Sequence, residues 1–275
     1  MLLTEMRNEK TKHIDKMSTK EMVRVIQDEN INAAMSLENE LGSIESAIDA
    51  ITERMAKGGR LFYVGCGTSG RLGVVDASEC PPTYGVDHGT VVGIIAGGDK
   101  AIRKAAEGAE DSKESGRADI EAQGLTALDS VVGISAAGGA AYVLGAFEVA
   151  SEVGALRVSL TSNEKTALEE AADIAIHPLT GPEVVTGSTR MKAGTAHKMV
   201  LNMISTSVMI KLGLVYENLM INLKPTNKKL RARMIGIVSD ITGEDKEFSE
   251  KLLEDNGFVI RAALERYNAK KQKFS

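Results

Sequence analysis

Five short apolar runs alternate with helix-like stretches through the middle of this 275-residue chain, and this alternation limits the folds that it can adopt. Short apolar strands that are separated by helices predict a parallel sheet covered by helices on both faces. The sequence therefore predicts an α/β fold with three layers and a parallel five-stranded sheet. The predicted strands are residues 61–64, 91–95, 131–135, 156–160 and 173–176.

Helical segments are predicted on either side of the sheet. The motif STKE at residues 18–21 is typical of a helix start, and apolar residues then recur at helical spacing up to residue 57. The chain after residue 226 is charged and helix-like as well. The predicted parts are an N-terminal helical segment that packs on the sheet domain, the sheet domain itself, and a small helical C-terminal region: 1–57, 58–226 and 227–275.

The motif GCGTSGRLG follows the first predicted strand directly and is typical of a site for an anion. Glycines let the backbone approach a ligand closely, and a helix start offers free N–H groups and the positive end of the helix dipole. We therefore predict that Gly67, Thr68 and Ser69 bind an anion. Arg71 and Lys192 are candidates for neutralising its charge.

The same motif satisfies the pattern G-x-G-x-x-G, so a dinucleotide-binding fold is an alternative. In that fold an acidic residue follows about 20 residues later, whereas Asp99 lies 29 residues after Gly70. The first crossover also contains Pro81, Pro82 and Gly85, which are expected to break a helix. We therefore favour the phosphate of a small metabolite, and a glycine turn without any ligand is the structural alternative.

Composition excludes several classes of protein and of site. A net charge of −5 offers no basic surface for nucleic acid or for an acidic membrane. The longest apolar segment, residues 199–210, is too short and too polar to span a bilayer, and the charged N-terminus does not resemble a signal peptide. The cysteines, Cys66 and Cys80, are too few for a disulfide framework or a zinc site, so we expect no metal and a cytoplasmic location.

Two glutamates, Glu79 and Glu110, are candidates for catalysis, although glutamates are most often solvated surface residues. A pair of carboxyl groups serves as general acid and general base when burial raises the pKa of one of them. A straight helix from Gly70 would place Glu79 about 14 Å away. Either this helix ends early and folds back, or Glu79 reaches the pocket of a neighbouring subunit.

Several blocks of the chain together resemble the N-acetylmuramic acid 6-phosphate etherase family, which belongs to the sugar isomerase (SIS) fold group. The blocks occur in the family's order and cover nearly the whole chain, which makes the resemblance far more specific than one glycine motif. The matching blocks include TEMRN, GGRLFYVGCGTSGRLGVVDASECPPTYGV, AAEGAEDS, GPEVVTGSTRMKAGTAHKMVLNM and ENLMINLKPTN.

The resemblance implies a lyase without a cofactor, in the recycling of cell-wall amino sugars. Its substrate would be N-acetylmuramic acid 6-phosphate, and its products N-acetylglucosamine 6-phosphate and D-lactate. The matching positions make Glu79 the general acid and Glu110 the general base, and they bring Glu183 and Lys192 into the substrate site. The resemblance also implies a homodimer, which the apolar helix predicted over residues 195–214 supports.

One loop departs from the family pattern. It reads ISAAGGAAYV, where etherases have a loop similar to AASGRTPYV, so Ala137, Gly139 and Ala140 stand at the Ser, Arg and Thr positions. Each lost charge-assisted bond to a phosphate weakens binding by roughly 1.5–3 kcal/mol. The residues still expected at the substrate in this loop and the next are Ser135, Ala137, Gly138 and Asn163.

The altered loop keeps two other functions open. One is a regulator that binds a sugar phosphate without turning it over, similar to the SIS-containing regulatory protein that inhibits glucokinase. The other is a lyase or isomerase that acts on another phosphosugar. The loop favours these alternatives, whereas the pair of Glu79 and Glu110 favours the etherase.

Overall fold

A computed structural model describes most of the chain, and it divides that chain into two compact units. The residues described are 1–223, 225 and 227–272. The units are Met1–Ser78 with His88–Val208, and Glu79–Asp87 with Met209–Ser275. The predicted boundary at residue 226 and the predicted end of the last part at residue 275 lie outside the described residues. The division into three parts stays a prediction.

The first unit is built on a parallel sheet. Its strands are β1 (Leu61–Gly65), β2 (Val91–Ile95), β3 (Ser130–Ile134), β4 (Leu156–Leu160) and β5 (Ile174–Ile176). They lie in the order β2-β1-β3-β4-β5, and all neighbours are parallel. Every residue of β1 and β3 is buried, as expected for strands that helices cover on both faces. The five strands predicted from the apolar runs are confirmed.

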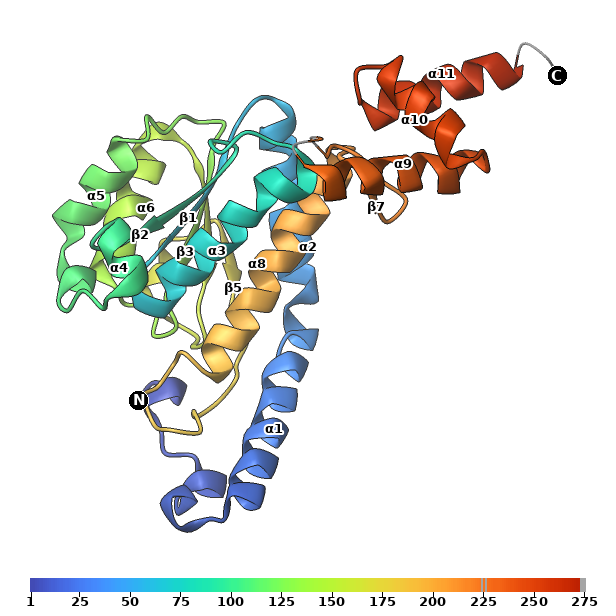
Figure 1. Cartoon of the computed structure of the whole chain (residues 1–275). Helices are drawn as coiled ribbons and strands as arrows, with labels where there is room; N and C mark the ends of the chain where they lie inside the picture. The colour runs from blue at the N-terminus through green and yellow to red at the C-terminus, as the bar shows by residue number, and fades with distance from the viewer. Residues whose placement is uncertain (224, 226, 273–275) are drawn as a thin grey trace. The chain divides into compact units, whose positions relative to one another are not determined.

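Helices cover both faces of this sheet (Figure 1). Those on one face are α2 (Leu41–Ala56), α3 (Gly67–Tyr84) and α8 (Lys192–Lys211), and those on the other are α5 (Lys113–Glu121) and α6 (Ala141–Val153). Successive side chains of a strand point to opposite faces. Phe62 and Val64 accordingly pack into one core with Phe147 of α6, while Tyr63 is buried on the other side of β1. The predicted three-layer α/β fold is confirmed.

The N-terminal segment is helical, as predicted. Helix α1 (Thr19–Met35) begins at a capping box, in which Ser18 and Glu21 each accept a hydrogen bond from the other's backbone N–H. Three short 3-10 helices precede it: η1 (Leu3–Glu5), η2 (Glu9–Thr11) and η3 (Ile14–Lys16). Residues 1–16, which contain these three helices, are called the N-terminal strap below.

Helices α5 and α6 touch backbone to backbone. A Cβ added at Gly116 of α5 would overlap the carbonyl oxygen of Tyr142, and one added at Gly145 of α6 would overlap that of Lys113. Only glycine fits at these two crossing points, because a protein interior has no spare volume for the extra carbon. The two helices are therefore held at a fixed separation.

One expectation about the first crossover, which joins β1 to β2, is wrong. Helix α3 runs through Pro81 and Pro82 and ends at Tyr84, so the prediction that these prolines break the helix is wrong. Neither proline has the N–H that a helix residue donates four positions back, so α3 lacks these two bonds and ends within one turn of them. Gly85 ends the helix, with a φ of +71° and its N–H donating to the carbonyl of Pro81 over 2.9 Å.

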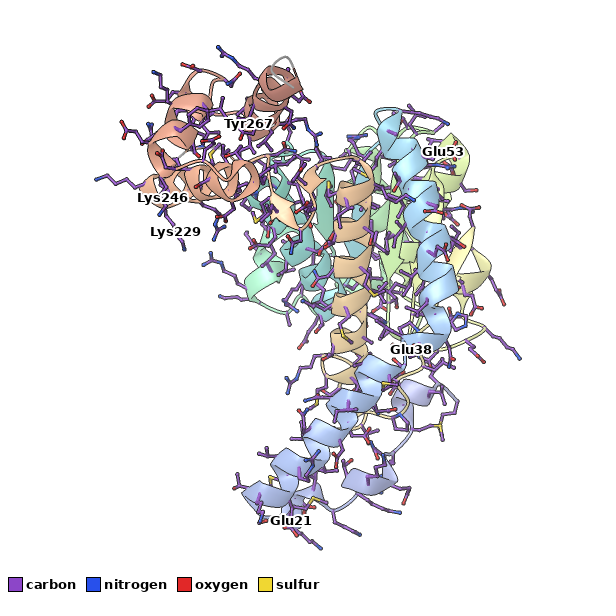
Figure 2. The ribbon with its side chains drawn as sticks, turned by 90° about the vertical axis from the view of Figure 1, so that its right-hand side faces the viewer. Glu21, Glu38, Glu53, Lys229, Lys246 and Tyr267 are labelled. Atoms are coloured by element: carbon purple, nitrogen blue, oxygen red, sulfur yellow. The ribbon has the colours of Figure 1, made fainter. Side chains whose placement is uncertain are left out.

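The second unit is small and mostly helical. Its elements include β6 (Val215–Tyr216), β7 (Leu219–Met220), α9 (Lys228–Thr242), α10 (Lys246–Glu254) and α11 (Ile260–Gln272). Tyr267, labelled in Figure 2, packs in its core and donates a hydrogen bond to the carbonyl of Thr242 over 3.0 Å. The predicted C-terminal helices are confirmed. Within the described part of the chain, no helix has both the length and the apolar character needed to cross a membrane.

Candidate active site

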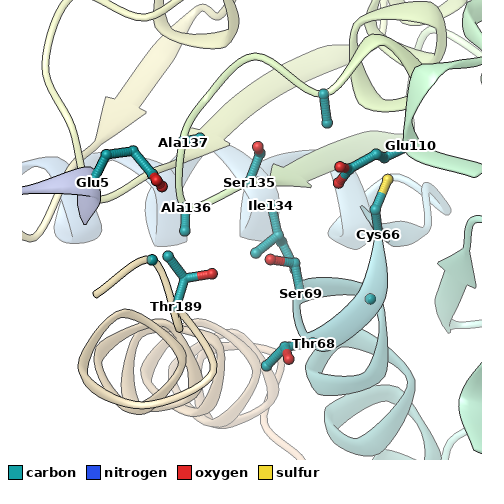
Figure 3. Close-up of a pocket in the computed structure, with 13 residues that line it drawn as sticks. Glu5, Cys66, Thr68, Ser69, Glu110, Ile134, Ser135, Ala136, Ala137 and Thr189 are labelled. Carbon is teal, nitrogen blue, oxygen red and sulfur yellow. The ribbon is translucent and has the colours of Figure 1, made fainter. Parts of the chain in front are cut away.

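A cavity of about 320 Å³ lies at the carboxyl ends of β1 and β3, where ligands of parallel sheets bind (Figure 3). Its volume is in the range of small-molecule sites. The predicted site residues that line it are Gly67, Thr68, Ser69, Glu110, Ser135 and Ala137. The other lining residues are Glu5, Cys66, Ile134, Ala136, Ala140, Gly187 and Thr189.

The start of α3 forms the first wall. The chain leaves β1 at Gly65 and enters the 18-residue helix at Gly67. The first N–H groups of a helix have no partner within it, and the helix dipole makes this end positive. The hydroxyl groups of Thr68 and Ser69 lie beside these N–H groups at the cavity. This wall is therefore able to donate several hydrogen bonds to an anion.

The loop after β3 forms the second wall, and it carries few polar side chains. Ala137 and Ala140 present methyl groups to the cavity. The hydroxyl of Ser135 accepts a hydrogen bond from the N–H of Gly138 over 3.1 Å, which leaves its own O–H free to donate. Gly138 itself has a φ of +72° and lies against Thr166, so it shapes the loop. The wall thus lacks most of the groups that would hold a phosphate.

Glu110 belongs to the third wall, on the 3-10 helix η5 (Ala109–Asp111). It also lines a smaller neighbouring cavity of about 180 Å³. Cys66 lines both cavities, and burial raises the pKa of its thiol to about 12, with the charges of Glu110 and Asp111 adding to the effect. The thiol is protonated at neutral pH and is a poor nucleophile. Glu110 is the group on this wall that is suited to accept a proton.

The fourth wall carries residues that the sequence analysis did not identify. Glu5 of η1 and Thr189 of the loop before α8 line the cavity beside Gly187 (Figure 3). Both lie in blocks that match the etherase pattern, but neither follows a strand of the predicted sheet. Their position in those blocks is the signal from which both residues could have been predicted.

The two cations predicted to neutralise a phosphate have other partners. Arg71 donates from Nε and Nη2 to the carbonyls of residues 102 and 101, over 2.9 and 2.6 Å, and lines the smaller cavity. Lys192 is buried and pairs with the carboxylate of Glu29. The described lining of the larger cavity accordingly contains two carboxylates and neither Lys nor Arg.

Glu183 and Asn163 support the walls of the cavity. Glu183 is buried and accepts the N–H groups of Lys192 and Ala193, over 2.8 and 3.0 Å, which caps α8. Burial raises the pKa of its carboxyl, against the opposite effect of these two bonds. Asn163 is also buried and donates to the carbonyl of Ala136 over 2.8 Å. Direct contact of either residue with a substrate stays a prediction.

Glu79 is not among the described residues that line the cavity. It is exposed on α3, and the helix continues past it, so the helix does not end early and fold back. Ten residues beyond Ser69 correspond to about 15 Å along a helix. Action in the pocket of a neighbouring subunit is the alternative that the continuous helix favours.

Replacing Glu29 by Met is expected to lower the free energy of unfolding by about 3–5 kcal/mol. Glu29 and Lys192 are both almost fully buried and pair directly. The substitution keeps the volume of the side chain but leaves a buried ammonium group without a counter-charge. Urea unfolding of the wild type and the variant measures the difference.

Glu53→Met is the matched control for this substitution. Glu53 pairs with Lys57 on the exposed side of α2 (Figure 2), and exposed pairs contribute less than about 1 kcal/mol. The double variant Glu29→Met/Lys192→Met removes both buried charges and is expected to recover most of the lost stability. If Glu29→Met and Glu53→Met lower the free energy of unfolding equally, the buried pair does not stabilise the fold.

Comparison with known proteins shows close relatives along nearly the whole chain. A family model described as the glucokinase regulatory protein N-terminal SIS domain matches residues 43–151. An N-acetylmuramic acid 6-phosphate etherase from Caldanaerobacter subterraneus is 54% identical over 263 residues, which cover 96% of this chain and 86% of that protein. The etherase of Symbiobacterium thermophilum is 51% identical over 96% of this chain and 87% of its own length.

Solved structures of more distant proteins share the fold. A putative phosphosugar isomerase from Bacteroides fragilis has a TM-score of 0.55 and 20% identity, covering 71% of this chain and 94% of that one. A phosphoheptose isomerase from Francisella tularensis has a TM-score of 0.53 and 17% identity, covering 70% and 98%. At these identities the likeness concerns the fold alone, and it agrees with the layers described above.

Proposed function

The chain belongs to the N-acetylmuramic acid 6-phosphate etherase family, and we propose that the cavity lined by Glu110 is its active site. The protein is a carbon–oxygen lyase that cleaves the lactyl ether of N-acetylmuramic acid 6-phosphate to N-acetylglucosamine 6-phosphate and D-lactate. The observation that carries the assignment is the 54% identity to an etherase over 96% of this chain.

In the proposed mechanism Glu110 is the general base. With the sugar ring open, the aldehyde acidifies the proton on C2, and the carboxylate of Glu110 removes it. The electron pair forms a C2–C3 double bond as the C3–O bond breaks, and Glu79 as general acid protonates the departing lactate oxygen. Water then adds across the double bond, with OH on C3 and H on C2, which gives N-acetylglucosamine 6-phosphate.

The phosphate is proposed to bind at the start of α3. Thr68 and Ser69 offer hydroxyl groups there, beside the free N–H groups of the helix. Ser135 on the adjoining wall adds an O–H donor. This arrangement holds an anion with neutral donors and the helix dipole rather than with a cation.

We propose that the protein acts as a homodimer in which Glu79 serves the partner's cavity. The continuous helix α3 supports this, as described above. Helix α1 also exposes Val23, Ile31 and Met35, spaced by multiples of four residues, and such an apolar row is typical of a covered surface. The apolar residues of α8, on which the sequence argument for a dimer relied, are mostly buried within the chain.

Mixing the variants Glu79→Gln and Glu110→Gln tests the shared site. Each is expected to be inactive alone. A hybrid dimer has one intact cavity if Glu110 comes from one chain and Glu79 from the other, so random mixing is expected to restore up to about a quarter of wild-type D-lactate release. If both glutamates act within one chain, the mixture stays inactive, and the cross-subunit arrangement is wrong.

We place the protein in the cytoplasm as part of the same proposal. Its two cysteines, Cys66 and Cys80, are free thiols. Free thiols fit a reducing compartment, in which disulfides are rare.

Release of D-lactate from N-acetylmuramic acid 6-phosphate by the purified protein tests the proposed function. Stoichiometric D-lactate and N-acetylglucosamine 6-phosphate are the expected result. The altered loop favours one alternative, a regulator that binds without turnover. A folded protein that binds N-acetylglucosamine 6-phosphate and releases no lactate would point to that regulator.

A further inference from the structure

The N-terminal strap lies against the loop that precedes α8. The side chain of Asn8 donates to the carbonyl of Pro182 over 3.2 Å, and the hydroxyl of Thr11 donates to the carbonyl of Val184 over 2.8 Å. Asn8 and Thr11 are both buried. A segment that buries polar side chains with satisfied hydrogen bonds is an integral part of the fold. The strap is therefore a fixed wall of the first unit.

Asn163 fastens the start of the strap to the cavity. The N–H of Leu3 donates to Asn163 Oδ1 over 2.6 Å, and Asn163 Nδ2 donates to the hydroxyl of Thr4 over 3.1 Å. The same Nδ2 donates to the carbonyl of Ala136, a residue that lines the cavity. One buried side chain thus joins the strap to the loop after β3, directly before Glu5 in the chain.

Glu5 reaches the cavity between these two anchored stretches of the strap. Its carboxylate points into the cavity from the side opposite Glu110 (Figure 3). A Cβ added at Gly187 would lie 3.4 Å from Glu5 Oε2, so the carboxylate packs on a residue without a side chain. In the described part of the chain, no hydrogen bond or ion pair engages this carboxylate. Its acceptor capacity is available to a ligand.

The chemistry of a carboxylate limits what Glu5 is able to bind. An ionised carboxylate accepts hydrogen bonds and donates none. It repels a phosphate or another carboxylate, and the described lining of the cavity has no Lys or Arg to offset that repulsion. The hydroxyl groups and the amide N–H of an N-acetyl amino sugar are neutral donors, and they match a free carboxylate.

We propose that Glu5 binds the substrate by accepting hydrogen bonds from the neutral donors of its N-acetyl amino sugar, on the side of the cavity opposite Glu110. This inference rests on the proposed function and adds a residue to it. By holding the face of the sugar that carries the hydroxyl and amide donors, Glu5 directs the phosphate and the lactyl carboxylate of the substrate away from itself. Glu5 is therefore a specificity-determining residue, and the segment that supplies it is distant from the strands in sequence.

Substitution of Glu5 combined with two ligands tests the proposal. Glu5→Ala is expected to weaken binding of N-acetylglucosamine 6-phosphate by about 10- to 100-fold in calorimetry, the loss of one or more bonds to a charged acceptor. KM for N-acetylmuramic acid 6-phosphate rises in parallel, while kcat changes by less than about threefold, because the same bonds form in ground and transition states. Binding of inorganic phosphate is unchanged or tighter, since a repelling charge is gone.

Glu9→Ala is the matched control. Glu9 is an exposed glutamate of the same strap that pairs with Lys12 and does not line the cavity. This variant is expected to bind both ligands within about twofold of the wild type. The conservative variant Glu5→Gln keeps one acceptor oxygen and is expected to lie between Glu5→Ala and the wild type. Equal thermal stability of the three variants shows that the strap is intact.

Two results would overturn the proposal. Glu5→Ala with unchanged affinity for the sugar phosphate shows that Glu5 does not contact the sugar. Glu5→Ala with tighter binding of both the sugar phosphate and inorganic phosphate shows that its charge acts by repulsion alone. Both outcomes are read from binding, so they are distinguishable from failure of the proposed function, in which the wild type binds N-acetylglucosamine 6-phosphate but releases no D-lactate.

Discussion

Glu110→Gln is expected to lower the rate of D-lactate release by about 10²- to 10⁴-fold, the contribution typical of a positioned general base. The amide has the size of the carboxyl group but does not take a proton from C2. Proton transfer at C2 offers a second measurement. In D₂O the wild type incorporates deuterium at C2 of the product N-acetylglucosamine 6-phosphate, and Glu110→Gln is expected to lose this exchange together with turnover.

Asp111→Asn is the matched control for this prediction. Asp111 is the next residue on η5, is exposed, and does not line the larger cavity. Its substitution removes the same charge at nearly the same place and is expected to leave the rate within about twofold. If Glu110→Gln keeps more than about a tenth of wild-type activity, Glu110 is not the base.

Rebuilding the loop after β3 is expected to strengthen substrate binding by about 100-fold or more. The triple variant Ala137→Ser/Gly139→Arg/Ala140→Thr gives the loop the two hydroxyl groups and the guanidinium typical of etherases. Each charge-assisted bond to a phosphate is worth roughly 1.5–3 kcal/mol, so two such bonds suffice for this gain. KM for N-acetylmuramic acid 6-phosphate and the Kd of N-acetylglucosamine 6-phosphate measure it.

The three substituted positions face open space or the cavity. Ala137 and Ala140 already line the cavity, and a Cβ added at Gly139 meets no atom within 4 Å. Ala140 is also the N-cap of α6 and makes no side-chain cap, so a threonine there is expected to add about 1 kcal/mol of stability. Higher thermal stability would therefore show that the new loop has folded as intended.

Ala118→Ser is the control for the rebuilt loop, because Ala118 is exposed on α5 and does not line the cavity. It is expected to leave KM and Kd unchanged. A folded triple variant with the affinity of the wild type would mean that this loop does not hold the phosphate in this chain. The start of α3 and Ser135 alone would then bind the phosphate.

Most of the fold could be predicted because its signals are local. An apolar run such as Leu61–Val64 marks a buried strand wherever the chain later places it, and the STKE motif marks a helix start through bonds between neighbours. Pro81 and Pro82 were misjudged because their neighbours Cys80 and Tyr84 are buried, and tertiary packing stabilises a helix more than two backbone hydrogen bonds do.

The site could be predicted only in part, because a sequence shows which residues are charged but not which partners they meet. Thr68 and Glu110 were found from a strand end and a matching block, and both line the cavity. Lys192 was an equally plausible candidate for neutralising the anion, yet it pairs with Glu29, 163 residues away in the chain. Glu5 was missed for the same reason, since only the folded strap brings it to the sheet.

Gly116 and Gly145 let the backbones of α5 and α6 come into contact, and this contact makes the position of Glu110 independent of the side chains in the loop after β3. Helix α5 follows directly after the short helix that bears Glu110, and α6 begins where the altered loop ends. Because their backbones are in contact, the side chains of the loop are free to be replaced without displacing Glu110. Substitutions in this one loop are thus able to change the ligand while the residue that takes the proton stays in place.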